Sequence, residues 1–332
     1  MRVSTRRAEG RDARLLELLA DGRFHSGEAI AQAMGVSRAA VWKGVQRLRA
    51  LGGEIDALRG RGYRCRYPIE ALSAQVIASH LASSTRALLD RLDVVASIDS
   101  TNTTLLGEAA SDHRLLFAEY QRCGRGRRGR RWESPWSGGL YLSLRWVYAD
   151  LPSGPGGLSL LVGVALADAL EALGYGAIGV KWPNDLFRDD RKLGGVLIEL
   201  SGDPSGPCRL VIGVGINWYM PQALASELDQ PAMGLLNTTC AGPLPGRNRV
   251  AAALADALVR ACQEFPDNLG DSLAERWRRR DVLYGREIVI RQACGSVKGR
   301  MAGIDHQGAL LIETATGLRR FYSGETRVRF AQ

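Results

Sequence analysis

Residues 124–131 read Gly-Arg-Gly-Arg-Arg-Gly-Arg-Arg. The spacing of these glycines matches the dinucleotide-binding fingerprint, in which a helix begins at the third glycine. Here Pro135 stands where the second turn of that helix would lie, and it would break the helix. Residues 140–146 then alternate apolar and polar side chains, which indicates a strand. The sequence therefore excludes a nicotinamide-binding Rossmann unit and predicts a glycine-rich loop that leads into a β-strand.

The composition of this loop suits the binding of an anion. Glycines let backbone N–H groups approach a ligand closely. The arginines between them add positive charge and paired donors that fit phosphate and carboxylate. The alternative is a solvated basic loop, or one that binds nucleic acid. Cys123 stands beside the loop, and we treat its thiol as incidental.

The chain has 332 residues, of which 45% are hydrophobic and 24% are charged. This composition is typical of globular proteins and leaves room for two or three domains. No apolar run reaches membrane-spanning length and the N-terminus has no signal-peptide core, so we expect a cytoplasmic protein without a membrane partner. Its six cysteines stand apart with no C-x-x-C pair, which favours reduced thiols over disulfides or a fixed metal site.

The positive charge of the chain is unevenly placed. The net charge is +9, and residues 1–66 carry fourteen Arg and Lys against seven Asp and Glu. This asymmetry indicates nucleic acid as the partner of that segment. Lysine is scarce and occurs only at positions 43, 181, 192 and 298. A chain that uses arginine almost everywhere is expected to keep lysine where arginine would not serve.

The N-terminal segment predicts a helix-turn-helix at about residues 23–42. Ser26 caps a short helix, Gly35 turns the chain, and Ser37 caps a second helix over residues 38–51. Apolar residues on one face of this second helix alternate with basic residues on the others. Two helices joined by a glycine-containing turn, the second of them basic, are typical of DNA-binding domains. The alternative is a small three-helix interaction domain.

Residues 54–58 and 63–66 predict a β-hairpin after these helices, with two arginines and two glycines at its tip. Such a basic wing would contact phosphates without reading base sequence. The DNA-binding residues predicted from the helix and the wing are Arg38, Trp42, Lys43, Arg59 and Arg61.

Polar clusters follow apolar strands at three places in the central segment. They are residues 99–102, 121–131 and 181–185, and binding sites commonly collect at such strand ends. Lys181 follows the buried run 178–180 and is a plausible cation for a phosphate or carboxylate. No Ser-His-Asp or Cys-His arrangement is evident, so we expect positioning and charge stabilisation rather than covalent catalysis.

The C-terminal segment predicts a small β-barrel of about fifty residues. Its short alternating strands are punctuated by glycines. They are expected at residues 286–291, 297–304, 309–313 and 319–322.

Eight motifs carry a resemblance to a known family. They are FHSGE (24–28) with SRAAVWK (37–43), STN (100–102), YQRCGRGRRGRRW (120–132), VKWPNDL (180–186), RKLGG (191–195), IGVGIN (212–217) and IDHQGALL (304–311). Together they resemble the bifunctional biotin protein ligases that also repress the biotin operon, over nearly the whole chain. The glycine-arginine loop with KWPND is highly specific for this family.

The resemblance implies an α+β, multidomain fold. We expect a winged helix-turn-helix in residues 1–67 and a C-terminal SH3-like β-barrel in residues 281–332. Between them, residues 68–280 would form a catalytic domain whose mixed sheet resembles that of class II aminoacyl-tRNA synthetases.

The resemblance also implies an activity. Biotin and ATP, with Mg²⁺, would give biotinyl-5'-AMP, and the biotinyl group would pass to one lysine of the biotin carboxyl carrier protein of acetyl-CoA carboxylase. The adenylate would act as co-repressor, forming a homodimer that binds a palindromic operator. The alternatives are a lipoate or octanoate ligase on the same scaffold, and a biotin-sensing transcription factor without catalysis.

Site residues follow from the matching motifs. Arg127 and Lys181 would be catalytic, Trp132 would form a wall of the pocket, and Asn184 and Asp185 would contact the adenylate or magnesium. No metal is expected at a fixed protein site. The residues that the resemblance assigns to biotin are Ser100, Thr101, Asn102, Gln121, Gly124, Arg125, Gly126, Arg127 and Lys181.

Overall fold

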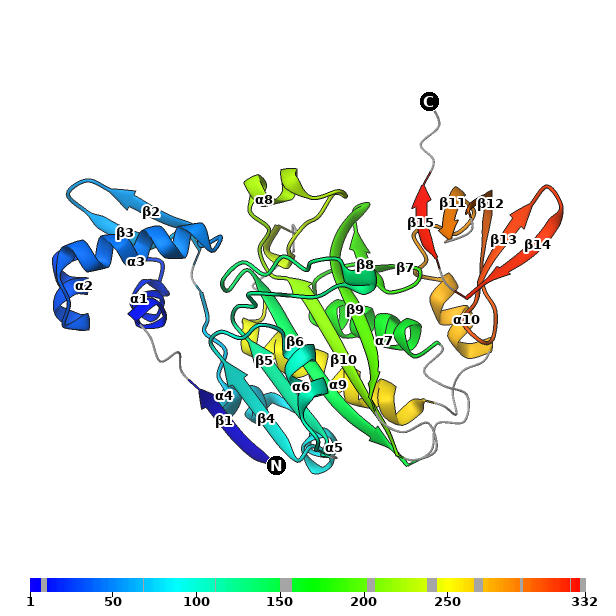
Figure 1. The fold of residues 1–332 in the computed structure, drawn as a ribbon, viewed down its shortest axis with the longest axis horizontal. Helices are drawn as coiled ribbons and strands as arrows, with labels where there is room; N and C mark the ends of the chain where they lie inside the picture. The colour runs from blue at the N-terminus through cyan, green and yellow to red at the C-terminus, as the bar shows by residue number, and fades with distance from the viewer. Residues whose placement is uncertain are drawn as a thin grey trace.

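Three domains lie side by side in the computed structural model, with the N-terminal helices at one end and the C-terminal sheet at the other (Figure 1). The structure describes residues 1–6, 11–67, 69–110, 112–149, 157–201, 207–237, 244–265, 271–292, 295–322 and 324–328.

The N-terminal domain is a winged helix-turn-helix, as predicted. Ser26 and Ser37 cap their helices by accepting hydrogen bonds from the amides of Ala29 and Ala40, and Gly35 ends the first of them at φ 64°. Its elements are α1 (Arg11–Leu19), α2 (Gly27–Met34), α3 (Arg38–Ala50), β2 (Ile55–Leu58) and β3 (Gly62–Cys65).

The wing is tied to the start of the helix-turn-helix. The His25 amide donates to the Tyr63 carbonyl at 2.8 Å, and the Tyr63 amide donates back at 2.9 Å. A Cβ at Gly62 would lie 1.9 Å from the His25 carbonyl oxygen, so this approach requires glycine. The bridge fixes the β2–β3 hairpin beside α3.

The central domain is built on an eight-stranded mixed sheet in the order β1-β4-β5-β6-β10-β9-β8-β7. The pairs β1–β4 and β4–β5 are parallel, and the other neighbours are antiparallel. The strands are β1 (Arg2–Arg6), β4 (Arg91–Val95), β5 (Arg114–Ala118), β6 (Gly139–Tyr148), β7 (Gly179–Lys181), β8 (Asp185–Arg188), β9 (Arg191–Ser201) and β10 (Cys208–Asn217).

Helices cover this sheet unequally. The long helices α7 and α9 pack on one face, and the short α6 lies on the other, where its Leu105 joins Leu116 and Val211 in a small separate cluster (Figure 1). The helices are α4 (Ala74–His80), α5 (Ser83–Leu88), α6 (Thr101–Gly107), α7 (Leu158–Ala172), α8 (Gln222–Glu227), α9 (Arg247–Glu264) and α10 (Asp271–Arg278).

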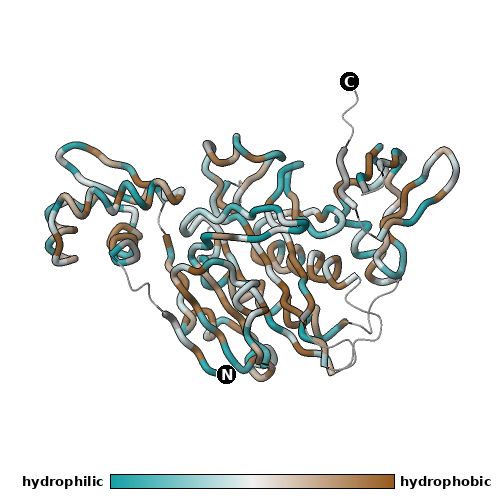
Figure 2. Tube along the Cα trace, in the orientation of Figure 1, coloured by the Kyte–Doolittle hydropathy of each residue, from teal (hydrophilic) through white to brown (hydrophobic). Residues whose placement is uncertain are grey.

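The two faces of the sheet have different side chains. In β6, Leu142 and Leu144 belong to the main apolar core, while Ser143 and Arg145 point to the opposite face because successive side chains alternate. Figure 2 shows the apolar colouring concentrated in the central strands and in α7. The face that carries α6 therefore holds polar side chains close to the glycine-arginine loop.

Strand β1 is an addition to this sheet from the start of the chain. Arg2–Arg6 lies within the range predicted for the DNA-binding domain, but it pairs in parallel with β4. Val3 packs against the main core. The backbone of β1 satisfies hydrogen-bonding groups that β4 would otherwise expose at the edge of the sheet.

The winged helix rests on the central domain. The Trp136 amide donates to the Leu51 carbonyl at the end of α3 over 3.3 Å, and the rings of Tyr67 and Tyr219 lie 4.3 Å apart. An apolar pocket lies between the two domains and is lined by residues of both. Trp136 stands shortly after the glycine-arginine loop in the sequence. Its hydrogen bond to Leu51 therefore connects the segment that follows the loop to the end of α3.

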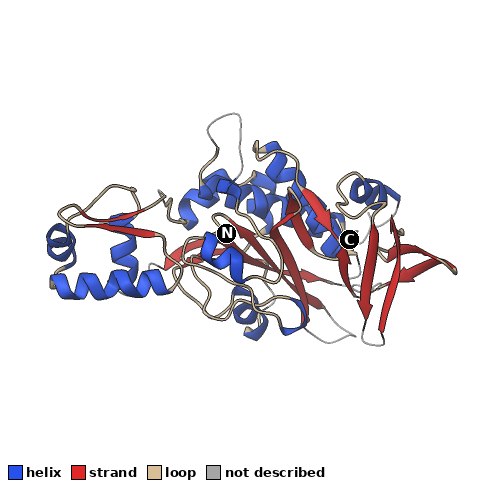
Figure 3. Ribbon diagram, turned by 90° about the horizontal axis from the view of Figure 1, so that it is seen from above, coloured by secondary structure: helices blue, strands red, loops and turns tan. Residues whose placement is uncertain are grey.

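The C-terminal domain is a five-stranded antiparallel sheet in the order β14-β13-β12-β11-β15 (Figure 3). The four predicted strands are present, and β15 is a fifth that the pattern did not reveal. The strands are β11 (Glu287–Gln292), β12 (Gly295–Ile304), β13 (Leu310–Thr314), β14 (Gly317–Phe321) and β15 (Glu325–Val328).

Within the described part of the chain, none of the helices combines the length and the apolar character that a membrane span requires. The cysteines in that part are free thiols, at positions 65, 123, 208 and 262. Cys240 and Cys294 lie outside the described residues.

Candidate functional site

The first turn of α6 forms one part of the candidate site. Ser100 caps the helix by accepting from the Thr103 amide at 3.3 Å. Gln121 Oε1 accepts hydrogen bonds from the Thr101 amide at 2.9 Å and from its hydroxyl at 3.1 Å. Ser100, Thr101 and Gln121 are all buried, so two of the predicted polar clusters meet at one place.

Asn102 connects α6 to the middle of the sheet. Ser143 Oγ lies 2.6 Å from Asn102 Oδ1, and Asn102 Nδ2 donates to the Glu199 carboxylate at 3.0 Å. A Cβ at Gly213 would lie 2.3 Å from Asn102 Oδ1. The first glycine of the IGVGIN motif therefore leaves the space that Asn102 fills.

The glycine-arginine loop folds back on itself. The Trp132 amide donates to the Gly124 carbonyl at 2.9 Å, and the Gly126 amide donates to the Arg130 carbonyl at 2.7 Å. Its only regular element is a short 3₁₀ turn at Arg127–Gly129. A Cβ at Gly124 would lie 2.4 Å from the Trp132 carbonyl, so this glycine is required by close packing. The structure confirms that the loop does not open an α-helix.

Two arginines of the loop lie on the site side of the sheet. Arg125 Nη2 is 2.9 Å from the Glu199 carboxylate. Arg127 Nη1 contacts Asn184 Oδ1 at 3.5 Å. Burial, together with the like charges of Arg128 and Arg130, lowers the pKa of Arg127, although an arginine remains charged at neutral pH. A half-buried cation among like charges would be stabilised by an anionic ligand.

Trp132 covers the glycines of two strands. A Cβ at Gly215 would lie 2.6 Å from Trp132 Cε2, and one at Gly195 would lie 3.5 Å from Trp132 Cζ3. Lys192 Nζ lies 5.4 Å from the centre of the Trp132 ring, a cation–π contact. The indole Nε1 is buried and has no hydrogen-bond partner. Because a buried donor of this kind is costly, it marks a place where a ligand acceptor would fit.

The KWPND turn joins β7 to β8. Lys181 and Asp185 are paired across these strands, and the Asn184 amide donates to the Lys181 carbonyl at 3.2 Å. The Asn184 side chain donates to the Val196 carbonyl at 2.7 Å, which fixes the turn against β9. Lys181 Nζ lies 5.0 Å from the centre of the Phe187 ring. Asn184 thus has a structural contact in addition to its contact with Arg127.

Asp185 is the carboxylate available for a metal in this turn. It forms an ion pair of 2.8 Å with Lys192, and the described residues contain no group of three or more His, Cys, Asp or Glu that could hold a metal ion. Mg²⁺ in nucleotide sites is commonly held by one or two carboxylates together with phosphate oxygens. Among the described residues, this turn therefore offers one carboxylate, which Lys192 already pairs.

Three residues of the site were missed by the sequence analysis. Glu199 binds Asn102 and Arg125, and Ser143 also contacts Asn102. Lys192 packs on Trp132. The scarcity of lysine was a signal for Lys192, which belongs to the RKLGG motif. Glu199 and Ser143 lie inside apolar strands, and only the register of the sheet places them.

The predicted DNA-contacting side chains are exposed. Trp42 has 54% of its surface accessible, an unusual fraction for a large apolar side chain. Arg61 packs its guanidinium 4.6 Å from the centre of the Phe24 ring, which orients it on the wing. The exposed set comprises Arg38, Trp42, Lys43, Arg59 and Arg61.

The fold and the site together define the class of biotin and lipoate protein ligases. Residues 94–217 match the biotin/lipoate A/B protein ligase family. Residues 11–64 match an HTH domain, and residues 284–326 match the biotin protein ligase C terminal domain.

Two relatives show to which family within this class the chain belongs. The chain is 39% identical over 321 residues to the bifunctional ligase/repressor BirA of Salmonella typhimurium, covering 96% of this chain and 97% of the relative. The BirA of Escherichia coli is 38% identical, with the same shares of the two chains covered. The chain therefore belongs to the bifunctional ligase/repressor BirA family.

Solved structures agree with this assignment. The biotin protein ligase from Aquifex aeolicus in complex with biotin and ATP superposes with a TM-score of 0.61 at 28% identity, covering 73% of this chain and all of that one. The multidomain fold class and the family resemblance are thus confirmed. The roles of individual site residues stay predictions.

Proposed function

We propose that this protein activates biotin with ATP and transfers the biotinyl group to a lysine of a carrier domain. The main support is one arrangement: the polar first turn of α6, the glycine-arginine loop and the KWPND turn converge on one face of the sheet. The relatives that match 96% of the chain are named bifunctional ligase/repressors, and a structural neighbour holds biotin and ATP.

Recognition of biotin is assigned to the neutral polar groups. The ureido ring of biotin carries a carbonyl acceptor and two N–H donors and has no charge. Hydroxyl and amide side chains offer both donors and acceptors, and Thr101, Asn102 and Gln121 supply them from a buried surface. Buried groups of this kind reject a ligand that cannot pair with them. This favours biotin over lipoate, whose ring has no matching polar edge.

Activation requires two anions to meet. A carboxylate oxygen of biotin attacks the α-phosphorus of ATP, an O–P bond forms, and the bond to the β-phosphate oxygen breaks to release pyrophosphate. Positive charge must screen this approach. Arg125 and Arg127 of the loop and Lys181 of β7 would supply it, and Mg²⁺ that arrives with ATP would add to it. The half-buried position of Arg127 strengthens its interaction with an anion.

Transfer replaces the bond between the biotinyl group and the phosphate with an amide bond to the carrier lysine. The amine of the carrier lysine attacks the acyl carbon, the bond to the phosphate oxygen breaks, AMP leaves, and the attacking amine loses a proton. The mixed anhydride is reactive toward water, so a loop that covers it protects it. The glycine-arginine loop lies over the site face and is held there by Arg125.

We assign repression to the same chain. The exposed basic face of α3 and the wing would bind operator DNA, and the adenylate would be the co-repressor that favours a homodimer. Two winged helices related by a two-fold axis can each bind one half-site of a palindromic operator. The hydrogen bond from Trp136 to Leu51 links the segment after the loop to the end of α3. This contact is a route by which the bound ligand could bias DNA binding.

Pyrophosphate release tests the first step. The purified protein with ATP and Mg²⁺ should release pyrophosphate when biotin is added and not when lipoate is added. Release with lipoate alone would assign the chain to lipoate chemistry. Binding of biotin without release would support a sensor that lacks catalysis.

A further inference from the structure

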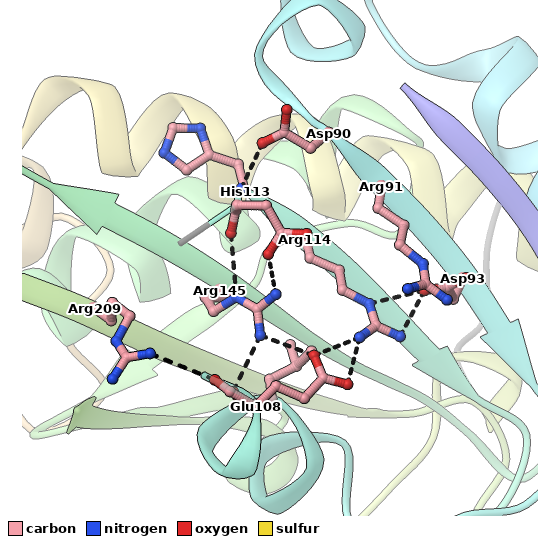
Figure 4. A network of polar contacts seen from close by, with 10 residues as sticks. Asp90, Arg91, Asp93, Glu108, His113, Arg114, Arg145 and Arg209 are labelled. Carbon is pink, nitrogen blue, oxygen red and sulfur yellow. Dashed lines mark hydrogen bonds and ion pairs between the residues drawn. The ribbon is translucent and has the colours of Figure 1, made fainter. Parts of the chain in front are cut away.

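A buried arginine lies beneath α6 (Figure 4). Arg145 of β6 has 1% of its surface exposed. Its guanidinium donates to the Glu108 carboxylate at 2.9 Å and to the Leu105 carbonyl at 3.3 Å, and it also pairs with Asp112. All three partners belong to the last turn of α6 or to the segment that follows it. A buried charge is tolerated only where such partners surround it.

Glu108, the residue that ends α6, is held from several sides. Arg114 of β5 pairs with its carboxylate at 2.5 Å, and Arg209 of β10 reaches its carbonyl at 3.5 Å. Burial alone would raise the pKa of Glu108, but hydrogen bonds from Arg114 and Arg145 outweigh it and lower that pKa. The carboxylate is therefore charged at neutral pH, and three strands of the sheet hold the end of the helix.

The other end of α6 is fixed by the same strand. Ser143 is fully buried and lies two residues before Arg145 on the same face of β6. Its hydroxyl oxygen is 2.7 Å from Thr101 Oγ1 and 2.6 Å from Asn102 Oδ1. One strand thus holds the first turn of the helix through Ser143 and the last through Arg145.

Polar contacts are important for α6 because its apolar contacts are few. The helix is seven residues long, and helices this short are not stable without tertiary contacts. The apolar cluster beneath it contains only Leu105, Leu116 and Val211 as buried members among the described residues. The ion pairs at the end of α6 therefore act together with the contacts of its first turn to set the position of the helix.

We propose that Arg145 and Glu108 are positioning residues for biotin recognition, which set the place of α6 so that Thr101 and Asn102 meet the ureido ring. This inference rests on the proposed function. Neither residue is placed in contact with the reacting atoms. A displaced first turn would misalign the hydrogen bonds to the ring directly, whereas Arg127 and Lys181 lie on other elements, so the larger effect should fall on biotin rather than on ATP.

Steady-state kinetics with four variants tests this. Arg145→Met removes the central cation, and Glu108→Gln removes its partner while keeping the shape of a side chain that is 35% exposed. The matched control is Arg91→Met, since Arg91 pairs with Asp93 at 2.6 Å in the same network and no described contact joins it to α6. Arg145→Lys restores a cation. Melting temperatures report folding in each case.

The KM for biotin should rise about tenfold in Arg145→Met and in Glu108→Gln, whereas kcat and the KM for ATP should change less than about twofold. Arg145→Lys should recover part of the loss, and Arg91→Met should match the parent. Unchanged KM for biotin in folded Glu108→Gln would overturn the inference even if Arg145→Met does not fold. Equal rises in the KM for biotin and in the KM for ATP would also overturn the inference. A parent protein that shows no biotin-dependent reaction would instead contradict the proposed function.

Discussion

Arg125 of the glycine-arginine loop forms an ion pair with Glu199 of β9 at 2.9 Å, and the same carboxylate accepts a hydrogen bond from Asn102. One acidic side chain therefore connects the loop, the sheet and the first turn of α6. Because Arg125 is 46% exposed, the ion pair is partly screened by water and contributes modestly.

Glu199→Gln should loosen the loop. The loop is rich in arginine, so trypsin cleavage there reports how often it opens. We expect cleavage up to about fivefold faster in the variant, in keeping with the modest strength of an exposed ion pair. Glu275→Gln is the control, since Glu275 of α10 pairs with Arg279, the residue after that helix, away from the loop. Equal cleavage of parent and Glu199→Gln would contradict the tethering role.

Lys181→Ala should slow adenylate formation by about 100-fold or more, since removal of a single charge-stabilising group in an active site has effects of this size. Lys298→Ala, at an exposed lysine of β12, should leave the rate unchanged. Pyrophosphate release measured with both variants at saturating biotin and ATP checks this. An unchanged rate in folded Lys181→Ala would remove Lys181 from the mechanism.

Asp281 should make stability depend on pH. It lies where β7 meets the C-terminal domain, and burial raises its pKa to about 6, although the Leu283 amide and the Trp277 indole donate to it. A carboxyl whose pKa is raised on folding contributes stability below its unfolded pKa, and that contribution is lost as pH rises through the folded pKa.

Relative to Asp281→Asn, the parent should therefore lose about 1 kcal/mol of unfolding free energy between pH 5 and pH 8. Urea denaturation at several pH values measures this difference. Asp189→Asn is the control, because Asp189 is exposed and makes only loose ion pairs of 3.7 and 3.8 Å, and its profile should parallel that of the parent. Parallel profiles for Asp281→Asn would contradict the pKa assignment.

Operator binding should depend on both ligand and salt. Affinity should rise when biotin and ATP are present, and its logarithm should fall linearly with the logarithm of salt concentration. Arg59→Ala should reduce the slope by about two, because each protomer of the dimer loses one phosphate contact. Arg86→Ala, at an exposed arginine of α5, should leave the slope unchanged. A gel shift that is indifferent to ligand would contradict the co-repressor proposal.

The parts of the fold that were predicted depend on local signals. Ser26, Gly35 and Ser37 are next to the helices that they cap, so the helix-turn-helix was readable from short windows. Pro135 excluded a long helix after the loop for the same reason. The arrangement of the three domains was predicted from the family resemblance that the motifs carry.

The parts that were missed depend on contacts between distant segments. Strand β1 exists because β4 offers it an edge, and nothing in its own five residues distinguishes it from a basic tail. Glu199 and Ser143 became site residues only through the register of β6, β9 and β10. The ion pairs of Arg145 with Glu108 and Asp112 likewise follow from the pairing of β5 with β6.

Transfer of biotin to protein is the central claim. The purified chain, biotin, ATP and Mg²⁺ should be incubated with a biotin carrier domain, and the mass of the carrier read by mass spectrometry, with lipoate in a parallel tube. The proposed function predicts the addition of one biotinyl group to the carrier with biotin and no addition with lipoate. An unmodified carrier in the presence of measurable biotin binding would contradict it.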